Sequence, residues 1–311
     1  MPSNVGPHGR MWSRNRGFRR ARLPGCVKRH NVDGRCTQEM RVVPSCASVL
    51  FLKRYKLFTD VRTDMRRLQG KRALVTGAAG ALGQVICRRL VAEGADVVIV
   101  DLARDRAEAL AAELGRSRAE AVAVDLTDFD AVGEALTAVQ RERGVDILVN
   151  GAGGGAVVPF AELDAETWRT QLSRNLDTVF NVTRWVLPGM LDRRDGRIIN
   201  IASIAAVSGG RLVRNASAYA TAKAGVVGLT KALAIEVADR GVTVNALAPG
   251  AQATPGRDQD SAERRAALLD QIPTRLLGEP EHLAEAIVFL ASPAAVNITG
   301  VILPLDGGHS I

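Results

Sequence analysis

The chain has 311 residues, of which 47% are hydrophobic and 24% charged, proportions that are ordinary for a soluble globular protein and leave room for one large domain. Its net charge of +8 does not indicate a nucleic-acid-binding fold, because residues 1–64 hold 14 Lys and Arg against 4 Asp and Glu, whereas the rest of the chain holds 27 basic and 29 acidic residues. No apolar run reaches the roughly 18 residues of a membrane-spanning helix, so we expect no membrane segment.

Residues 1–64 form a basic extension without a clear helix or strand period. We expect a disordered tail, or an upstream stretch before a true start at Met65; a transit peptide and a basic arm for nucleic acid are the alternatives. Cys26, Cys36 and Cys46 lie in this extension, and Cys87 lies in an apolar helical pattern. Because these cysteines and the scattered histidines lack metal-ligand or disulfide spacing, we expect no metal site and a reducing, cytoplasmic location for a folded domain over 65–311.

From residue 72 onward, short apolar runs alternate with helical patterns. Strands are expected at 73–75, 97–100, 121–124, 147–149, 197–201, 242–247 and 301–305. Helices are expected up to about residue 93 after the first strand, over 104–114, 128–143, 166–192 and 281–291, and from Tyr219 onward. The strand runs are continuously apolar, which is typical of a parallel sheet covered by helices on both faces. The pattern predicts a single α/β domain with a doubly wound parallel sheet of about seven strands.

A glycine-rich turn, TGAAGALG over residues 76–83, follows the first strand and opens the first helix. Its glycines let the backbone approach a pyrophosphate, whose charge the helix N-terminus stabilises. Asp101 ends the second strand 18 residues beyond Gly83, where a carboxylate can bind a cofactor ribose. Asp125 ends the third strand and can accept from an adenine amino group, although Asp125 and Asp128 are equally suited to cap a helix. These features predict a Rossmann-type dinucleotide-binding domain.

Tyr219 and Lys223 lie four residues apart in an alanine-rich helical pattern, so their side chains share one helix face. A phenol is a poor acid or base at neutral pH, but a nearby ammonium favours the phenolate and should lower the pKa of the tyrosine. The pair can then act as a general acid/base, although the spacing is also that of an ordinary solvated pair.

In this order, the motifs resemble those of the short-chain dehydrogenase/reductase family, in its compact single-domain branch, over residues 70–309. Besides the glycine turn, the resemblance rests on Asn150-Gly-Ala-Gly153 after the fourth strand, Asn175 in the following helix, Ser203 after the fifth strand, Tyr219 with Lys223, Pro249-Gly250 with Thr254, and Asp306-Gly-Gly308. Each motif alone is weak, whereas the ordered set is specific.

The resemblance implies that Tyr219 exchanges a proton with the substrate hydroxyl or carbonyl while Ser203 hydrogen-bonds the same oxygen. Lys223 would bind the nicotinamide ribose and hold the tyrosine pKa down, and Asn175 would help to order a water that relays protons. The expected catalytic residues are therefore Asn175, Ser203, Tyr219 and Lys223. The expected cofactor-binding residues are Gly77, Gly80, Leu82, Gly83, Asp101, Asp125, Leu126, Asn150, Ala152, Gly153, Tyr219, Lys223, Pro249, Gly250 and Thr254, the last three meeting the nicotinamide carboxamide.

Three positions depart from the family pattern. Ala81 replaces a usual glycine, as in the extended branch of the family, but the 88 residues after Lys223 are too few for that branch's substrate domain. Gly151 replaces the second asparagine of the usual Asn-Asn-Ala-Gly. Ser203 lies 16 residues before Tyr219, which implies a small insertion and leaves Ser208 and Ser217 as alternates for the serine role.

We therefore expect an NAD(P)-dependent oxidoreductase that interconverts a small-molecule secondary alcohol and a ketone. A 3-oxoacyl thioester and a sugar or polyol are both compatible, because the loops over 154–160, 207–216 and 254–272 set the substrate; a catalytically inactive nucleotide-sensing module of the same fold is the alternative. Asp101 predicts NAD rather than NADP, with Arg104 as the residue that could offset it. Apolar helices over 175–192 and 219–239 predict a homotetramer or homodimer.

Overall fold

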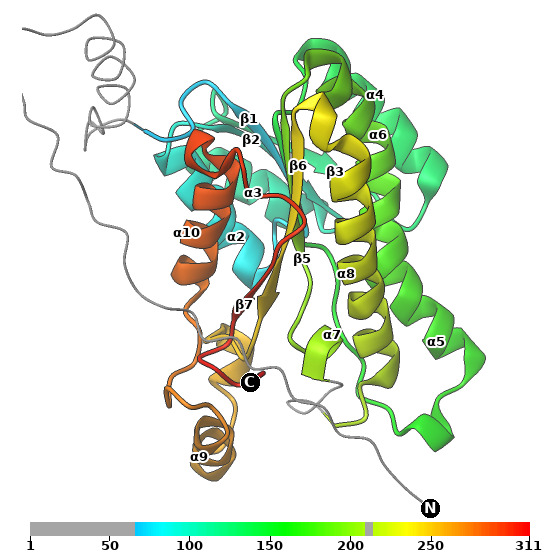
Figure 1. Ribbon diagram of the computed structural model, residues 1–311, viewed down its shortest axis with the longest axis vertical. Helices are drawn as coiled ribbons and strands as arrows, with labels where there is room; N and C mark the ends of the chain where they lie inside the picture. Colours follow the sequence, from blue (N-terminus) through cyan, green and yellow to red (C-terminus); the bar gives the residue numbers. More distant parts are fainter. Residues whose placement is uncertain (1–65, 209–213) are drawn as a thin grey trace, which may run out of the picture. The chain divides into compact units, whose positions relative to one another are not determined.

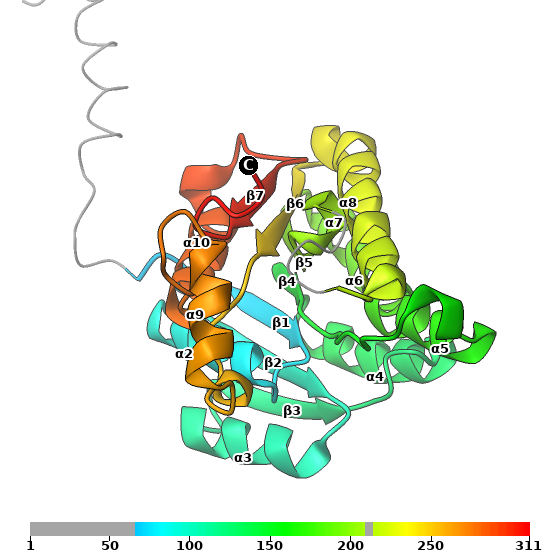
Figure 2. The same ribbon diagram turned by 90° about the horizontal axis from the view of Figure 1, so that it is seen from below.

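The computed structural model describes residues 66–208 and 214–311, so the expectations for 1–64 and for a start at Met65 lie outside the described residues. Within these ranges, seven parallel strands form one sheet in the order β3-β2-β1-β4-β5-β6-β7 (Figures 1 and 2). The strands are β1 (Arg72–Thr76), β2 (Asp96–Asp101), β3 (Ala119–Ala123), β4 (Ile147–Asn150), β5 (Gly196–Ile201), β6 (Val242–Pro249) and β7 (Ile302–Leu305). The predicted doubly wound sheet is confirmed.

Helices cover both faces of this sheet, as Figure 2 shows. On one face lie α2 (Ala81–Ala92), α3 (Arg104–Leu114) and α10 (Pro280–Ala291). On the other lie α4 (Phe129–Glu142), α6 (Thr178–Arg193) and α8 (Ser217–Val237). The described residues also form α5 (Ala165–Leu172), α7 (Ala205–Ser208), α9 (Ala262–Asp270), the 3₁₀ turns η1 (Phe160–Glu162), η3 (Ala238–Arg240), η4 (Pro255–Arg257) and η5 (Pro293–Ala295), and the π turn η2 (Ser173–Asp177).

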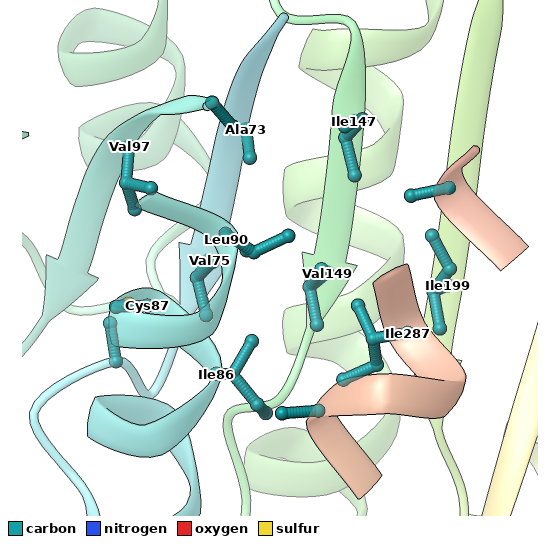
Figure 3. Close-up of a cluster of buried hydrophobic side chains, with 14 of the residues drawn as sticks. Ala73, Val75, Ile86, Cys87, Leu90, Val97, Ile147, Val149, Ile199 and Ile287 are labelled. Atoms are coloured by element: carbon teal, nitrogen blue, oxygen red, sulfur yellow. The ribbon is translucent and has the colours of Figure 1, made fainter. Parts of the chain in front are cut away.

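The core divides at the sheet into two apolar layers. In the first, Ile86 of α2 and Ile287 of α10 pack against Val75 and Val149 (Figure 3). In the second, α4, α6 and α8 pack their apolar stripes on the opposite face of the strands. Because both faces are buried, the strands have no polar face, which explains their continuous apolar runs.

The single helix expected over 166–192 is divided by η2 into α5 and α6. Within that turn the side-chain Nδ2 of Asn175 donates to the carbonyl of Gln171, 2.9 Å away, which a regular α-helix would bond to the Asn175 amide. Helix α9 was also missed: its residues lie in the expected loop over 254–272, although Ser261 accepts a capping hydrogen bond from the Arg264 amide. The N-cap serine was the signal that could have found this helix.

A buried polar ladder joins the centre of the sheet to α8. Asn150 and Asn200 are direct register partners on β4 and β5, and Asn150 Nδ2 donates to Asn200 Oδ1 at 2.8 Å. Asn200 Nδ2 in turn donates to Thr230 Oγ1 at 2.9 Å. The ladder therefore fixes α8, which carries Tyr219 and Lys223, against the two strands whose ends form the site.

Candidate active site

A cleft of about 850 Å³ opens at the carboxyl ends of β1 to β4, lined by the segments that follow these strands and by the start of α6. The strand order reverses between β1 and β4, and open α/β sheets bind ligands at such a switch point. The structure brings nine of the predicted cofactor-binding residues together in this lining: Gly77, Gly80, Leu82, Gly83, Asp101, Asp125, Leu126, Ala152 and Gly153.

The backbone of the glycine turn has a conformation and a close packing that a residue with a side chain would not fit. Gly77 has a φ of 64°, in the left-handed region. A Cβ added at Gly83 would lie 2.3 Å from the Gly77 carbonyl oxygen, so α2 packs directly on the turn. Gly80 is the N-cap of α2, and no described side chain caps this helix, which leaves its first N–H groups available to a phosphate. The turn therefore fits the diphosphate of a dinucleotide.

Asp101 is held at the end of β2 by two backbone hydrogen bonds. Its Oδ2 accepts from the Ala79 amide of the glycine turn at 2.9 Å, and its Oδ1 accepts from the Ala103 amide at 3.0 Å. Each carboxylate oxygen has a second acceptor site, so the fixed group can still accept from ribose hydroxyls.

Arg106 of α3 lines the cleft together with Asp101, as does Arg174 of η2, and sequence reasoning missed both. Arg104, the residue expected to offset Asp101, is 68% exposed, and its Nη1 lies 3.7 Å from Glu108 Oε1. Arg104 and Arg106 are two residues apart on α3 and point in different directions, and of the two only Arg106 lines the cleft. The expectation for Arg104 is corrected to Arg106.

Asp125 and Asp128 have different tasks. Asp128 caps α4, because its Oδ1 accepts from the amides of Asp130 and Ala131, both at 3.0 Å. Asp125 lines the cleft, and its Oδ1 accepts from the hydroxyl of Thr127 at 2.7 Å and from the Thr127 amide at 2.9 Å. The bond from the Thr127 hydroxyl lowers the pKa of Asp125 most, and the bond from the Thr127 amide adds to this effect. Asp125 is therefore an ionised acceptor that faces the cleft.

Thr76 ties the end of β1 to the turn after β4, and it was not among the predicted residues. Its Oγ1 accepts from the amides of Gly151 and Ala152 at 3.0 and 3.1 Å. Its position as the first residue of the glycine motif was the available signal. Asn150 differs from its expected place, since its side chain is 2% exposed and lies in the core, donating to Asn200 and, at 3.1 Å, to Thr183.

Asn175 lies in the π turn η2 and hydrogen-bonds the turn after β4, between the cleft and the catalytic residues. Its Oδ1 accepts from the Gly154 amide at 3.1 Å, and its Nδ2 donates to the Gly154 carbonyl at 2.8 Å. A Cβ added at Gly153, where φ is 146°, would lie 2.5 Å from Asn175 Oδ1 and 3.4 Å from Lys223 Nζ, so the position requires glycine. The side chain of Asn175 thus holds the backbone of the turn after β4, and its water-ordering role stays a prediction.

Ser203, Tyr219 and Lys223 converge between the end of β5 and the start of α8. Lys223 Nζ donates to the Ile201 carbonyl at 2.8 Å and lies 5.9 Å from the centroid of the Tyr219 ring. The Ser203 hydroxyl acts on the Tyr219 phenol so as to lower its pKa, and Ser203 Oγ accepts from the Ala205 amide at 3.1 Å. Of the alternate serines, Ser208 uses its hydroxyl to donate to the Ile204 carbonyl.

Burial shifts the pKa values of the catalytic pair. It raises the pKa of Tyr219, an effect that the Ser203 hydroxyl opposes, and it lowers the pKa of Lys223 to about 8. The expected net lowering of the tyrosine pKa is therefore wrong for the chain without cofactor, because the loss of hydration on burial dominates. At neutral pH the phenol keeps its proton and can donate it.

Pro249, Gly250 and Thr254 lie at and after the end of β6, outside the lining of the 850 Å³ cleft. The Pro249 carbonyl accepts from the Ile204 amide at 3.2 Å, next to Ser203. The Gly250 amide donates to the Leu305 carbonyl at 3.0 Å. Their contact with a carboxamide stays a prediction. Over 66–208 and 214–311, no group of three or more His, Cys, Asp or Glu side chains could hold a metal ion.

The chain is similar in sequence to a known protein family and to named relatives. A family model described as short chain dehydrogenase matches residues 71–265. The 3-oxoacyl-[acyl-carrier-protein] reductase FabG of Vibrio harveyi is 40% identical over 242 residues, 78% of this chain and 98% of the relative. The galactitol 2-dehydrogenase (L-tagatose-forming) of Cereibacter sphaeroides is 39% identical and covers 81% of this chain and 99% of the relative.

A solved structure is similar to this chain in both fold and sequence. A Beutenbergia cavernae protein assigned as an NAD(P)-dependent gluconate 5-dehydrogenase, with NADP bound at low occupancy, superposes with a TM-score of 0.72 at 39% identity, covering 78% of this chain and 98% of that chain. None of the described helices is both long and apolar enough to cross a membrane.

Proposed function

This chain belongs to the short-chain dehydrogenase/reductase family and is an NAD(P)-dependent oxidoreductase, and on that premise we propose that it interconverts a secondary alcohol and a ketone with Tyr219 as general acid/base. The observation that carries the proposal is the convergence of Ser203, Tyr219 and Lys223 beside the glycine segment of the cofactor cleft. The nicotinamide of NAD(P) supplies or accepts the hydride, so the protein must orient the carbon and manage one proton.

In the direction of ketone reduction, the protonated phenol of Tyr219 donates to the carbonyl oxygen. Ser203 then turns its single hydroxyl proton from the phenol to that oxygen and donates a second hydrogen bond to it, while its Oγ still accepts from the Ala205 amide. Lys223, held by the Ile201 carbonyl, stabilises the phenolate that remains after proton transfer.

Substitution of Tyr219 by Phe tests this proposal, because it removes the transferable proton and keeps the ring. We expect kcat to fall by about 10² to 10⁴, with the Kd for reduced cofactor, measured by fluorescence titration, nearly unchanged. Retention of most of the activity would show that another group transfers the proton. The alternative of an inactive nucleotide-sensing module is set aside, since the relatives are named as reductases and dehydrogenases.

NAD is the proposed preferred cofactor. The fixed carboxylate of Asp101 can accept from both ribose hydroxyls of NAD and would repel the 2′-phosphate of NADP. Arg106 acts in the opposite direction, because its guanidinium shares the cleft and can pair with a phosphate. Asp101→Ser should shift the ratio of kcat/KM values toward NADP, and Arg106→Gln should shift it toward NAD. A wild-type enzyme that already prefers NADP would overturn the preference.

We assign the protein to the cytoplasm as a homotetramer or homodimer, also as proposals. The free thiol of Cys87 is compatible with a reducing compartment. Exposed apolar side chains on two helices support self-association: Phe180 on α6 is 51% exposed and Ile235 on α8 is 83% exposed. The relatives leave a 3-oxoacyl thioester and a sugar or polyol open as substrates.

A further inference from the structure

After β4 the chain runs past the catalytic residues as a segment with almost no side chains, residues 151–156, here called the glycine strap. Its sequence is Gly-Ala-Gly-Gly-Gly-Ala. Glycine leaves a backbone more conformational freedom than other residues do, so such a run needs outside bonds to keep one conformation. Every second amide from Ala152 onward donates to a side-chain oxygen of another segment: Ala152 to Thr76, Gly154 to Asn175 and Ala156 to Gln171. Three side chains therefore set the path of the strap.

The strap lies directly against two catalytic side chains. A Cβ added at Gly155 would lie 3.2 Å from Tyr219 Cγ and 3.3 Å from Tyr219 Cδ2, so the Gly155 backbone covers one side of the ring. A Cβ added at Gly153 would lie 3.4 Å from Lys223 Nζ. The strap therefore keeps water from part of the tyrosine, and it contributes to the burial that raises the pKa of the phenol.

Gln171 of α5 holds the strap immediately after this contact. Its side chain is buried, and its Oε1 accepts from the Ala156 amide at 3.2 Å. The backbone carbonyl of Gln171 accepts from Asn175 Nδ2 at 2.9 Å, and Asn175 Oδ1 accepts from the Gly154 amide at 3.1 Å. The two side chains therefore support each other and bind the strap on both sides of Gly155. A buried glutamine costs free energy unless it is hydrogen-bonded, and Gln171 spends its acceptor oxygen on the strap.

We propose that Gln171 is a positioning residue for Tyr219: by holding Ala156 it keeps Gly155 against the ring, and so fixes the phenol in the orientation from which it transfers a proton. The inference rests on the proposed function, because that function assigns the proton transfer to Tyr219. Without the Gln171 oxygen, the strap has no side-chain anchor between Gly154 and the Val158 amide, which donates to the Asn215 carbonyl at 2.8 Å. The glycine run can then lift from the ring and admit water.

Gln171→Met tests the proposal, because methionine keeps the length of the side chain and removes the acceptor oxygen. Hydrogen exchange measured by mass spectrometry should become about three- to tenfold faster in a peptide that covers the strap, as expected for the loss of one hydrogen bond. The rate of ketone reduction in a single turnover, with acetoacetyl-N-acetylcysteamine or L-tagatose, should fall by about the same factor.

The third readout is the absorbance titration of Tyr219, which loosening of the fold elsewhere would not move. The chain has two tyrosines, Tyr55 and Tyr219, so the difference between each protein and its Tyr219→Phe form isolates Tyr219. Its titration midpoint should fall in Gln171→Met, toward that of an ordinary tyrosine, because water reaches the ring. Gln171→Glu keeps an acceptor oxygen, so it should retain the slow exchange of the strap and a midpoint at or above that of wild type.

Gln140→Met is the matched control. Gln140 Oε1 also accepts from a backbone amide, that of Val145 at 3.1 Å, but this bond lies before β4 begins instead of after it ends. All three readouts should stay at their wild-type values.

The inference is overturned if Gln171→Met leaves the exchange of the strap, the Tyr219 midpoint or the single-turnover rate unchanged. It is also overturned if exchange rises equally in peptides from the core of the sheet, because Gln171 would then support only the fold. These outcomes differ from failure of the proposed function, in which Tyr219→Phe keeps most of its activity, since exchange and titration need no substrate.

Discussion

Lys223 should make the free energy of unfolding of this protein depend on pH between about pH 8 and 10.5, because the side chain is buried. The side chain is 4% exposed, and burial lowers its pKa from the usual 10.5 to about 8. A shift of this size corresponds to roughly 3 kcal/mol. Below pH 8 the folded chain therefore carries a charged group whose burial opposes folding by an amount of that order.

Replacement by Met isolates this effect. Between about pH 8 and 10.5 the unfolded wild-type chain still binds a proton at Lys223 that the folded chain has released, so the free energy of unfolding rises with pH. Lys223→Met has no such group. We expect the unfolding free energy of wild type minus that of the variant to increase by roughly 3 kcal/mol between pH 8 and 10.5. The measurement is urea unfolding of both cofactor-free proteins at several pH values.

Lys231 provides the control, because it lies on the same helix and its side chain is exposed. The difference between wild type and Lys231→Met should stay constant with pH. Lys223→Met also loses the hydrogen bond to the Ile201 carbonyl. That loss lowers the unfolding free energy of the variant by the same amount at every pH, so it does not change how the difference from wild type depends on pH. A wild-type minus Lys223→Met difference that is constant from pH 7 to 10.5 would refute the burial argument.

Three further predictions concern the cofactor turn, the extension and assembly. Gly83→Ala should weaken cofactor binding by about tenfold or more in a fluorescence titration, because its Cβ would lie 2.3 Å from the Gly77 carbonyl oxygen; an unchanged Kd would contradict the close packing. A chain that starts at Met65 should fold and work as well as the full chain, and loss of solubility or activity on truncation would show that 1–64 is structural. Sedimentation should detect a homotetramer or homodimer, and a monomer at micromolar concentration would count against it.

The sheet could be predicted from the sequence because its strands are buried on both faces. The run Val97-Val-Ile-Val100 has no polar face, and it is fully enclosed in β2. The glycine turn was equally readable, since glycine is needed where α2 meets the Gly77 carbonyl. The positions of Tyr219 and Lys223 on one helix face follow from a spacing of four residues.

Properties that depend on tertiary surroundings could not be predicted in this way. The π turn at Asn175 arises from a side chain that bonds a carbonyl one turn earlier, and a hydrophobic period does not show it. The direction of the Tyr219 pKa shift depends on burial, which raises the pKa by more than the Ser203 hydroxyl lowers it. Whether Arg104 or Arg106 meets the cofactor is decided by the rotation of α3 about its axis.

The polar ladder of Asn150, Asn200 and Thr230 also bears on how the chain avoids misfolding. Adjacent strands rich in Val and Ile can slide past each other with little loss of apolar contact. A slip of one residue between β4 and β5 would turn one asparagine to the opposite face and leave its partner's amide buried and unbonded. The same slip would detach the helix that Asn200 holds through Thr230. Catalytic geometry and correct strand pairing are therefore acquired together, and a mispaired chain would not assemble the tyrosine site.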